Sequence, residues 1–225
     1  ADLKRIELIN SVADKESVIE LYKQFGTSAV TAIGSLNWRT AGFVATNNGA
    51  KLTADDSAKI ARFVTLCDAY SIPVVTFVDS EGFEKSSAAE LAGSIRDSAK
   101  LAQAYASATT AKIAVVTGKA YGSAYVALAS TAAGSDFTFA WEGAVIAPTT
   151  PEAAVVFLNG VSEDNAKQAQ EYADNEADAF TAAANGYVDR VITAEDTKSA
   201  LTSAIEATSS KRVVTPAKKH VNFVY

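Results

Sequence analysis

The residues best suited to chemistry lie in the segment GKAYGSAY, at residues 118–125. This segment follows the apolar run KIAVVTG and precedes an alanine-rich stretch, a pattern that predicts a turn from a strand into a helix. Gly118 and Gly122 allow the main chain to expose N–H groups at such a turn, and the helix that follows adds the positive end of its dipole. The segment is therefore suited to stabilise negative charge on an oxygen atom of a ligand.

A second candidate segment, DSEGF at residues 79–83, follows the apolar run IPVVTFV. If both apolar runs are strands of a parallel sheet, their carboxyl ends meet at one edge, where ligands usually bind. Gly82 and Phe83 are therefore candidates for the wall of the same pocket.

Several motifs with known mechanisms do not match the first segment. A phosphate-binding Walker loop would need Gly at the position of Ile113 and Ser or Thr at that of Ala120. A serine nucleophile elbow would need glycines two residues on either side of Ser123, where Tyr121 and Tyr125 stand instead. Neither a Walker loop nor a serine hydrolase is therefore predicted.

The composition excludes other classes of protein. Twenty Lys and Arg against 26 Asp and Glu give a net charge of −6 without a basic face, so nucleic acid is not an expected partner. A single cysteine, Cys67, and a single histidine, His220, cannot build a zinc cluster or an internal disulfide, so no metal is predicted and a reducing cytoplasm is expected. The acidic stretch at 174–178 is followed by Ala179 where a calcium loop needs glycine. No apolar run approaches the roughly 18 residues of a spanning helix, so membrane insertion is not expected.

The 225 residues, of which 48% are hydrophobic, predict one domain that covers residues 1–225. Apolar periodicity predicts an amphipathic helix at 14–25 that starts from an N-cap at Asp14. Because buried strands alternate with helices, the predicted class is α/β, with a parallel crossover between the two apolar runs. Further along the chain we expect a β-hairpin at 28–47, a capped helix at 53–70, a buried strand within 71–83, a helix at 87–108, a buried strand at 112–118, a helix at 125–133, strands at 136–141 and 143–148, a helix from Pro151, a strand at 187–193 and a last helix at 194–208.

Longer stretches of the chain carry a resemblance to a known family. They are RTAGFVATN, DDSAKIARFVTLCDAYSIP, IPVVTFVDSEGF, GSIRDSAKLAQAYASATTAKIAVVTGKAYGSAYVALAS, GSDFTFAWEGAVIAPTTPEAAVVF and AAANGYVDRVI with TPAKKH. In order, spacing and length they resemble the C-terminal half of a biotin-dependent acyl-CoA carboxyltransferase. This family includes the propionyl-CoA carboxylase β-chains and the carboxyltransferase subunits of sodium-pumping decarboxylases.

The resemblance implies a crotonase-like fold, in which repeated ββα units wind into a spiral and active sites form between subunits. Such enzymes move a carboxyl group between N1 of biotin, carried on a separate protein, and the α-carbon of an acyl-CoA. Departure of carbon dioxide from carboxybiotin leaves a basic ureido nitrogen, so the help expected from the protein is mainly electrostatic. In well-studied oxyanion holes the loss of one N–H donor costs about 3 to 4 kcal/mol.

The resemblance also assigns roles to residues of this chain. It implies that the backbone N–H groups of Ser123 and Ala124 hold the ureido oxygen of biotin, and that Gly122 permits the turn. Val126, small and apolar, is expected to favour a short and uncharged acyl chain. The remaining residues expected to line the substrate site are Gly118, Tyr121, Tyr125, Gly82 and Phe83.

The same resemblance implies partners. The donors for the thioester oxygen and most contacts with coenzyme A belong to the N-terminal half of the family, so an N-terminal carboxyltransferase half or subunit is an expected partner. A biotin carboxyl carrier protein and further copies of this chain, in a homo-oligomer, are expected as well. Lys218, Lys219 and His220 are either a solvated tail or contacts for the phosphates of coenzyme A.

Departures from the family pattern leave two alternatives open. Ser123 stands where the family has the second of two adjacent glycines, and Glu81 replaces a rigid proline in Asp-x-Pro-Gly-Phe. At 149–154 the chain also departs from a Met-Gly-Pro-Glu-Gly pattern. The chain could therefore be a catalytically degenerate assembly module on the crotonase fold, with Gly118 and Gly122 serving turn geometry and the tyrosines serving the core. A crotonase-type enzyme that acts on acyl-CoA without biotin is the second alternative.

Overall fold

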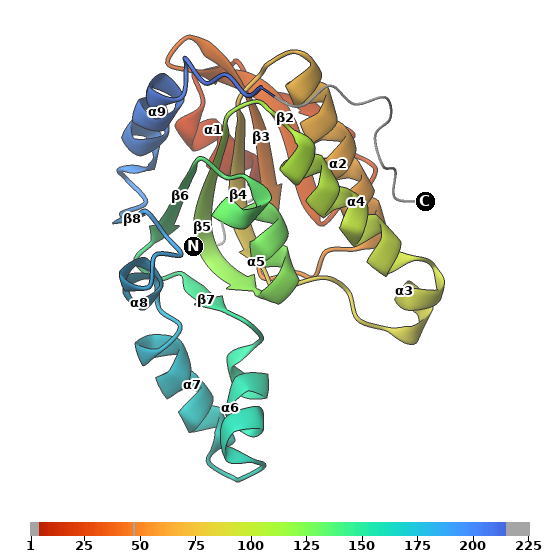
Figure 1. Cartoon of the computed structure of the whole chain (residues 1–225), viewed down its shortest axis with the longest axis vertical. Coiled ribbons are helices and arrows are strands. Elements are labelled where there is room, and N and C mark those ends of the chain that lie inside the picture. The colour runs from red at the N-terminus through yellow and green to blue at the C-terminus, as the bar shows by residue number, and fades with distance from the viewer. Residues whose placement is uncertain (1–4, 47, 215–225) are drawn as a thin grey trace.

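The computed structural model describes residues 5–46 and 48–214, in which one sheet lies between two layers of helices (Figure 1). The strands are β1 (Ile19–Leu21), β2 (Ala29–Leu36), β3 (Arg39–Thr46), β4 (Val74–Ser80), β5 (Lys112–Tyr121), β6 (Phe137–Trp141), β7 (Val145–Ala147) and β8 (Arg190–Ile192). The helices are α1 (Arg5–Val12), α2 (Ala54–Ala69), α3 (Ser87–Leu91), α4 (Ser94–Ser107), α5 (Gly122–Leu128), the 3₁₀ turn η1 (Thr131–Ala133), α6 (Pro151–Asn159), α7 (Asn165–Asn175), α8 (Ala179–Ala184) and α9 (Thr197–Ala207).

The sheet has the strand order β1-β2-β3-β4-β5-β6-β8, and β7 pairs with the far end of β5. The first three strands are antiparallel, and every pairing from β3 to β8 is parallel. The predicted hairpin and the parallel pairing of the two apolar runs are therefore confirmed.

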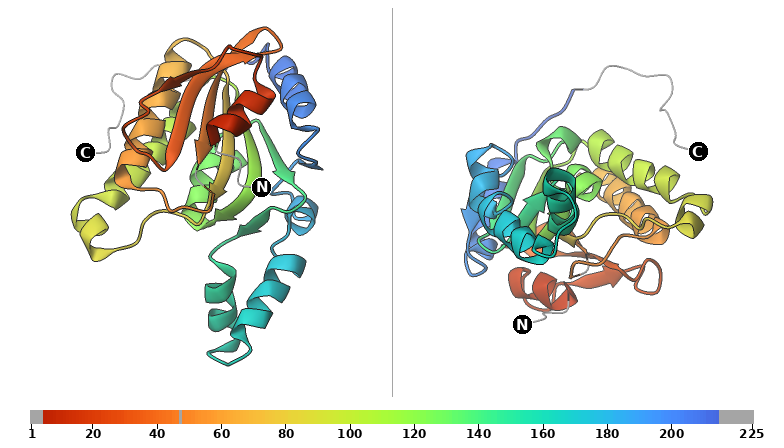
Figure 2. Two further views of the ribbon diagram at one scale, coloured as in Figure 1. Left: turned by 180° about the vertical axis from the view of Figure 1, so that it is seen from behind. Right: turned by 90° about the horizontal axis from the view of Figure 1, so that it is seen from below.

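Successive residues of the central strands face two separate cores, which is why these strands are apolar throughout. Val44, Val78 and Val116 pack with α2, α4 and α5 on one face. On the other face, Phe77 and Val115 belong to a cluster that includes α1 and α9. Figure 2 shows the same division, because α1 and α9 lie on the side of the sheet away from α2 and α4.

Beyond the main sheet the chain builds a short second layer of paired strands. Gly49 pairs with Ser80, and Leu52 pairs with Phe83. Ser80 also pairs with Ala120, and residues 119–121 of β5 pair with β7. Strand, short strand and helix thus follow one another four times, leading into α2, α3, α5 and α6. This is the repeated ββα arrangement that was expected.

The helix predicted from Thr53 is confirmed and owes its start to a reciprocal cap. The Thr53 hydroxyl accepts the Asp56 N–H at 3.2 Å, and the Asp56 carboxylate accepts the Thr53 N–H at 2.9 Å. The helix from Pro151, the strand near 187–193 and the last helix are also found, as α6, β8 and α9.

The helix predicted for residues 14–25 is wrong. Glu16 and Tyr22 have φ of 62° and 57°, values that a right-handed helix does not contain. The segment instead contributes the edge strand β1, in which Ile19 pairs with Ile33. Pairing with β2 therefore overrode a helical spacing of apolar residues, and the first helix is α1, at Arg5–Val12.

Three other boundaries differ from the prediction. The helix expected at 87–108 is split into α3 and α4 by Gly93, whose φ is 96°. The helix expected at 125–133 begins earlier, at Gly122, and ends at Leu128 before η1. The strand expected to end at Gly118 continues to Tyr121 because its last residues pair with β7.

Asp14, the expected helix cap, holds the turn between β2 and β3 instead. Its carboxylate accepts the N–H groups of Asn37 and Trp38 at 3.1 and 2.8 Å. Both turn residues have positive φ, as in the two-residue turns that match the twist of a hairpin. The N–H of Trp38 is the main cause that lowers the pKa of Asp14, with smaller help from Ser35, Asn37 and Lys198.

We predict that Asp14→Ala lowers the urea midpoint of unfolding at pH 7. Because the pKa of Asp14 is lower in the folded chain than in the unfolded chain, the carboxylate stabilises the fold above its unfolded value of about 4. That contribution is lost as pH falls through the lower, folded value, so the difference from the wild type should shrink below about pH 4. Glu163→Ala, at an exposed position, is the control. A difference for Asp14→Ala that stays constant with pH would contradict this role.

Candidate active site

The turn at Gly122 joins β5 directly to α5 and is possible only with glycine. Its φ is 57°, a value that side chains disfavour. A Cβ atom there would also lie 3.0 Å from the carbonyl oxygen of Pro148. The direction of the chain at this point is therefore set by a close contact between two main-chain segments.

The N–H groups that follow this turn are unused. Tyr121, the N-cap of α5, makes no side-chain capping bond. In residues 5–46 and 48–214 no hydrogen bond uses the N–H of Ser123 or Ala124. The Ala124 side chain is buried, whereas Ser123 is exposed. Two adjacent donors at the first turn of a helix can accept an anionic oxygen.

Ser123 fits the main chain without strain. It is absent from the residues with positive φ and lies inside α5, so a side chain costs nothing there in backbone conformation. The exchange of a family glycine for serine therefore leaves the direction of the N–H groups intact.

The structure brings the second predicted segment against the first. Ser80 pairs with Ala120, and a Cβ atom on Gly82 would lie 3.8 Å from the carbonyl oxygen of Tyr121. Gly82 has φ of 115°, and its N–H donates to the Ser80 hydroxyl at 3.2 Å. Phe83 is half-buried and packs against the core that contains α2 and α4. The two segments therefore form one edge.

Asp79 belongs to this edge and was not among the predicted site residues. Its carboxylate accepts the N–H of Lys119 at 2.9 Å. It also fills the space above Gly118, where a Cβ atom would lie 2.5 Å from Asp79 Oδ1. Gly118 therefore makes room for a carboxylate of the neighbouring strand. An acidic residue at the end of one strand and a glycine on the next were visible in the sequence, but their register was not.

Ion pairs surround this arrangement. Lys119 Nζ lies 2.7 Å from Glu81 Oε1, and the hydrogen bond to Glu81 raises the pKa of Lys119. Glu81, the departure from the family proline, is thus tied to the end of β5. Arg5 donates to the Thr46 carbonyl, and burial lowers its pKa to about 10 against the opposing charge of Asp79.

The aromatic candidates divide between core and edge. Tyr121 is 6% exposed and packs with Ala147 and Ala177. The Tyr125 hydroxyl donates to the Tyr187 carbonyl at 2.6 Å, and burial raises the pKa of Tyr125 to about 12. Val126 is 51% exposed, so it can touch a ligand or a partner.

Other predicted features carry no chemistry in the described chain. Cys67 is fully buried, and burial raises the pKa of its thiol to about 12. Within the described residues no group of three or more His, Cys, Asp and Glu could hold a metal ion. No helix in that part of the chain is long and apolar enough to cross a membrane. Lys218, Lys219 and His220 lie outside the described residues.

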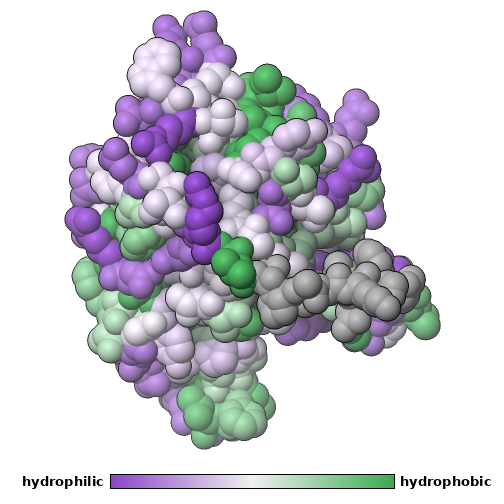
Figure 3. Space-filling view, turned by 45° about the horizontal axis from the view of Figure 1, so that its top comes forward, coloured by the Kyte–Doolittle hydropathy of each residue, from purple (hydrophilic) through white to green (hydrophobic). Residues whose placement is uncertain are grey.

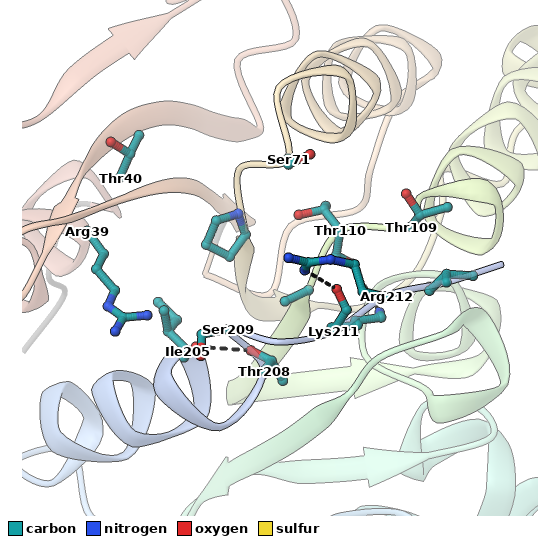
Figure 4. Close-up of a pocket in the computed structure, with 13 residues that line it drawn as sticks. Arg39, Thr40, Ser71, Thr109, Thr110, Ile205, Thr208, Ser209, Lys211 and Arg212 are labelled. Atoms are coloured by element: carbon teal, nitrogen blue, oxygen red, sulfur yellow. Dashed lines mark hydrogen bonds between the residues drawn. The ribbon is translucent and has the colours of Figure 1, made fainter.

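A cavity of about 600 Å³ lies at the opposite end of the sheet, beside the start of β4 and β5 (Figure 4). Arg39, Lys211 and Arg212 line it. Helix carboxyl ends converge there, and cations are favoured at such ends. Lys211 accordingly donates to the Thr110 carbonyl, which follows α4, and to Asp136. The basic lining is therefore explained by the fold, and we do not place the active site in this cavity.

An uncovered apolar surface lies on the projecting hairpin of α6 and α7. Val156, Phe157, Leu158 and Val161 are all exposed, and Phe157 and Val161 are each 89% exposed. The hairpin stands away from the sheet in Figure 1, and its tip is green at the lower end of Figure 3. An apolar patch of this kind marks a surface for contact with another protein.

Comparison with known proteins bears on the whole chain. The model of the carboxyl transferase domain family matches residues 3–223. The propionyl-CoA carboxylase beta chain of Cereibacter sphaeroides is 38% identical over 223 residues, which cover 96% of this chain and 44% of that protein. The methylmalonyl-CoA carboxyltransferase 12S subunit of Propionibacterium freudenreichii subsp. shermanii is 36% identical over 228 residues, which cover 96% and 44%.

The fold is shared with a solved relative. A structure described as the hexamer assembly of transcarboxylase 12S, with hydrolysed methylmalonyl-coenzyme A bound, matches with a TM-score of 0.94 at 35% identity. The match covers 100% of this chain and 45% of that one. This chain therefore spans less than half the length of the relatives that it matches.

We predict that Gly118→Ala destabilises the chain by about 1 to 3 kcal/mol, because the new methyl group overlaps the Asp79 carboxylate. In an Asp79→Ala background the same change should cost less, with a coupling energy of about 0.5 kcal/mol or more. Urea unfolding of the four proteins in this cycle measures both quantities. Gly143→Ala is the control, since a Cβ atom there meets nothing within 4 Å. Strictly additive costs would show that the carboxylate does not occupy this space.

Proposed function

The chain belongs to the carboxyl transferase domain family, and from this premise we propose that it forms the biotin-binding half of an acyl-CoA carboxyltransferase active site. The family and the crotonase-like fold predicted from the sequence are confirmed. The observation that carries the proposal is the pair of unused N–H groups at the Gly122 turn, in a chain matched by the family model almost from end to end.

The proposed chemistry is electrostatic. The N–H groups of Ser123 and Ala124 donate to the ureido oxygen of biotin, which gains negative charge as the carboxyl group leaves N1. Gly122 holds both donors in place before the ligand arrives, so no reorganisation is needed during the reaction. The dipole of α5 adds to their effect. Each donor of this kind contributes about 3 to 4 kcal/mol to the stability of the transition state.

The second substrate in this proposal is a coenzyme A thioester with a short acyl chain. The relatives named above are propionyl-CoA and methylmalonyl-CoA enzymes, and the transcarboxylase 12S structure has hydrolysed methylmalonyl-coenzyme A bound. Val126 lies one turn along α5 from the donor pair and is half exposed, as a residue that meets the acyl chain would be. A small apolar side chain there favours an uncharged acyl group.

The proposed partners are an N-terminal carboxyltransferase half, a biotin carboxyl carrier protein and further copies of this chain. The relatives are more than twice as long, which supports a separate half that supplies the thioester donors. The apolar side chains on the α6–α7 hairpin support burial in an assembly. A hexamer assembly of the transcarboxylase 12S relative gives the same support to further copies of this chain.

The departures from the family pattern are compatible with activity. Ser123 keeps a conformation that any residue adopts, and the charge of Glu81 is paired with Lys119. Thr150 caps α6 by accepting the Ala153 N–H, so the altered stretch at 149–154 still begins a helix. These contacts favour a working half-site over a degenerate assembly module.

We predict that this chain alone decarboxylates malonyl-CoA or methylmalonyl-CoA weakly or not at all with free biotin, and that addition of an N-terminal half restores turnover. In that complex Gly122→Ala should lower kcat by about 100-fold or more, because it misdirects the donors. Gly143→Ala, on an open surface, should keep the wild-type rate.

Two outcomes would overturn parts of this proposal. A wild-type complex without activity and without any biotin-induced change in thermal stability would favour the assembly module. An active complex in which Gly122→Ala matches the wild type would leave the family role intact but remove the donor pair from it.

A further inference from the structure

Tyr121 carries a hydroxyl group that nothing in the described chain uses. The residue is 6% exposed, yet no hydrogen bond involves its hydroxyl. Every fully buried side-chain nitrogen or oxygen of the described residues has a partner. The oxygen of Tyr121 must therefore reach solvent while its ring stays in the core.

Two other tyrosines with raised pKa show the usual alternative. The Tyr105 hydroxyl lies 2.8 Å from the Thr76 hydroxyl, and the Tyr125 hydroxyl donates to the Tyr187 carbonyl at 2.6 Å. Buried tyrosines normally find such partners. The hydroxyl of Tyr121 is instead available to a ligand.

The surroundings place this hydroxyl at the edge that holds the donor pair. Tyr121 directly precedes Gly122, and its ring is held by Ala147 and Ala177. Burial raises the pKa of Tyr121, and the positive charge of Lys119 opposes that shift. Smaller increases come from Glu152, Glu81 and Asp79, so the phenol lies among charges of the two candidate segments and the start of α6. At neutral pH the hydroxyl is therefore protonated and can donate.

We propose that the Tyr121 hydroxyl donates a hydrogen bond to the carboxyl group that is transferred, an inference that rests on the proposed function. The ureido oxygen already has two donors in Ser123 and Ala124, whereas the carboxylate bound to N1 needs donors of its own. Glu81 and Glu152, as carboxylates, cannot donate to it. Tyr121 can, and Lys119 supplies positive charge on the same side. Tyr121 is thus a catalytic residue that touches the reacting carboxyl group.

The test compares Tyr121→Phe with the wild type in the complex of this chain and its N-terminal half. The ring and its packing are kept, and the hydroxyl has no partner to lose, so the thermal midpoint should stay the same. Calorimetric titration uses two probes, free biotin and a biotin that carries a stable carboxymethyl arm on N1. We expect the variant to bind the carboxymethyl probe at least tenfold more weakly and to bind biotin as the wild type does. The kcat for decarboxylation of methylmalonyl-CoA with free biotin should fall at least tenfold.

The control is Tyr70→Phe, which removes an exposed hydroxyl at the far end of α2 and should change none of these values. Equal binding of the carboxymethyl probe by Tyr121→Phe and the wild type, or equal weakening of both probes, would overturn the assignment to the carboxyl group. A wild-type complex that binds neither probe would refute the biotin-binding function itself, and the role of Tyr121 with it.

Discussion

The contact between the main chain at Gly122 and the carbonyl oxygen of Pro148 is the constraint on which the site depends. At 3.0 Å it leaves no room for a side chain, and it forces β5 to turn into α5 without a loop. A turn this abrupt presents consecutive N–H groups that have no acceptor in the described chain. The second layer of short strands carries Pro148 to this position, because β7 pairs with the end of β5. Long-range pairing therefore determines a local arrangement of donors.

The two candidate segments are held together by contacts of different kinds. Asp79 accepts a main-chain N–H of β5 and occupies the space above a glycine, so it constrains the backbone directly. Glu81 reaches the same strand through the side chain of Lys119. One contact sets where the strands lie, and the other joins the turn after β4 to the end of β5.

Much of the fold could be predicted because its signals are local. Continuous apolar runs predicted the buried strands, and Thr53 with Asp56 predicted the start of α2. The helix at 14–25 failed because Asp14 is equally suited to cap a helix and to hold a hairpin turn, and only the pairing of β1 with β2 decides between them. At the site, the glycines and their segment could be identified from their order along the chain. The carboxylate over Gly118 could not, since it depends on the register between β4 and β5.

The ion pair between Glu81 and Lys119 has a consequence for behaviour in salt. Both side chains are partly exposed, at 33% and 47%, so dissolved ions reach them. At 1 M salt the Debye length is about 3 Å, and attraction between exposed charges is largely screened. The carboxylate of Asp79, anchored to an amide, does not depend on such attraction. Ionic strength should thus loosen one fastening of the DSEGF turn and spare the other, giving halophilic and freshwater relatives different rigidity at this position.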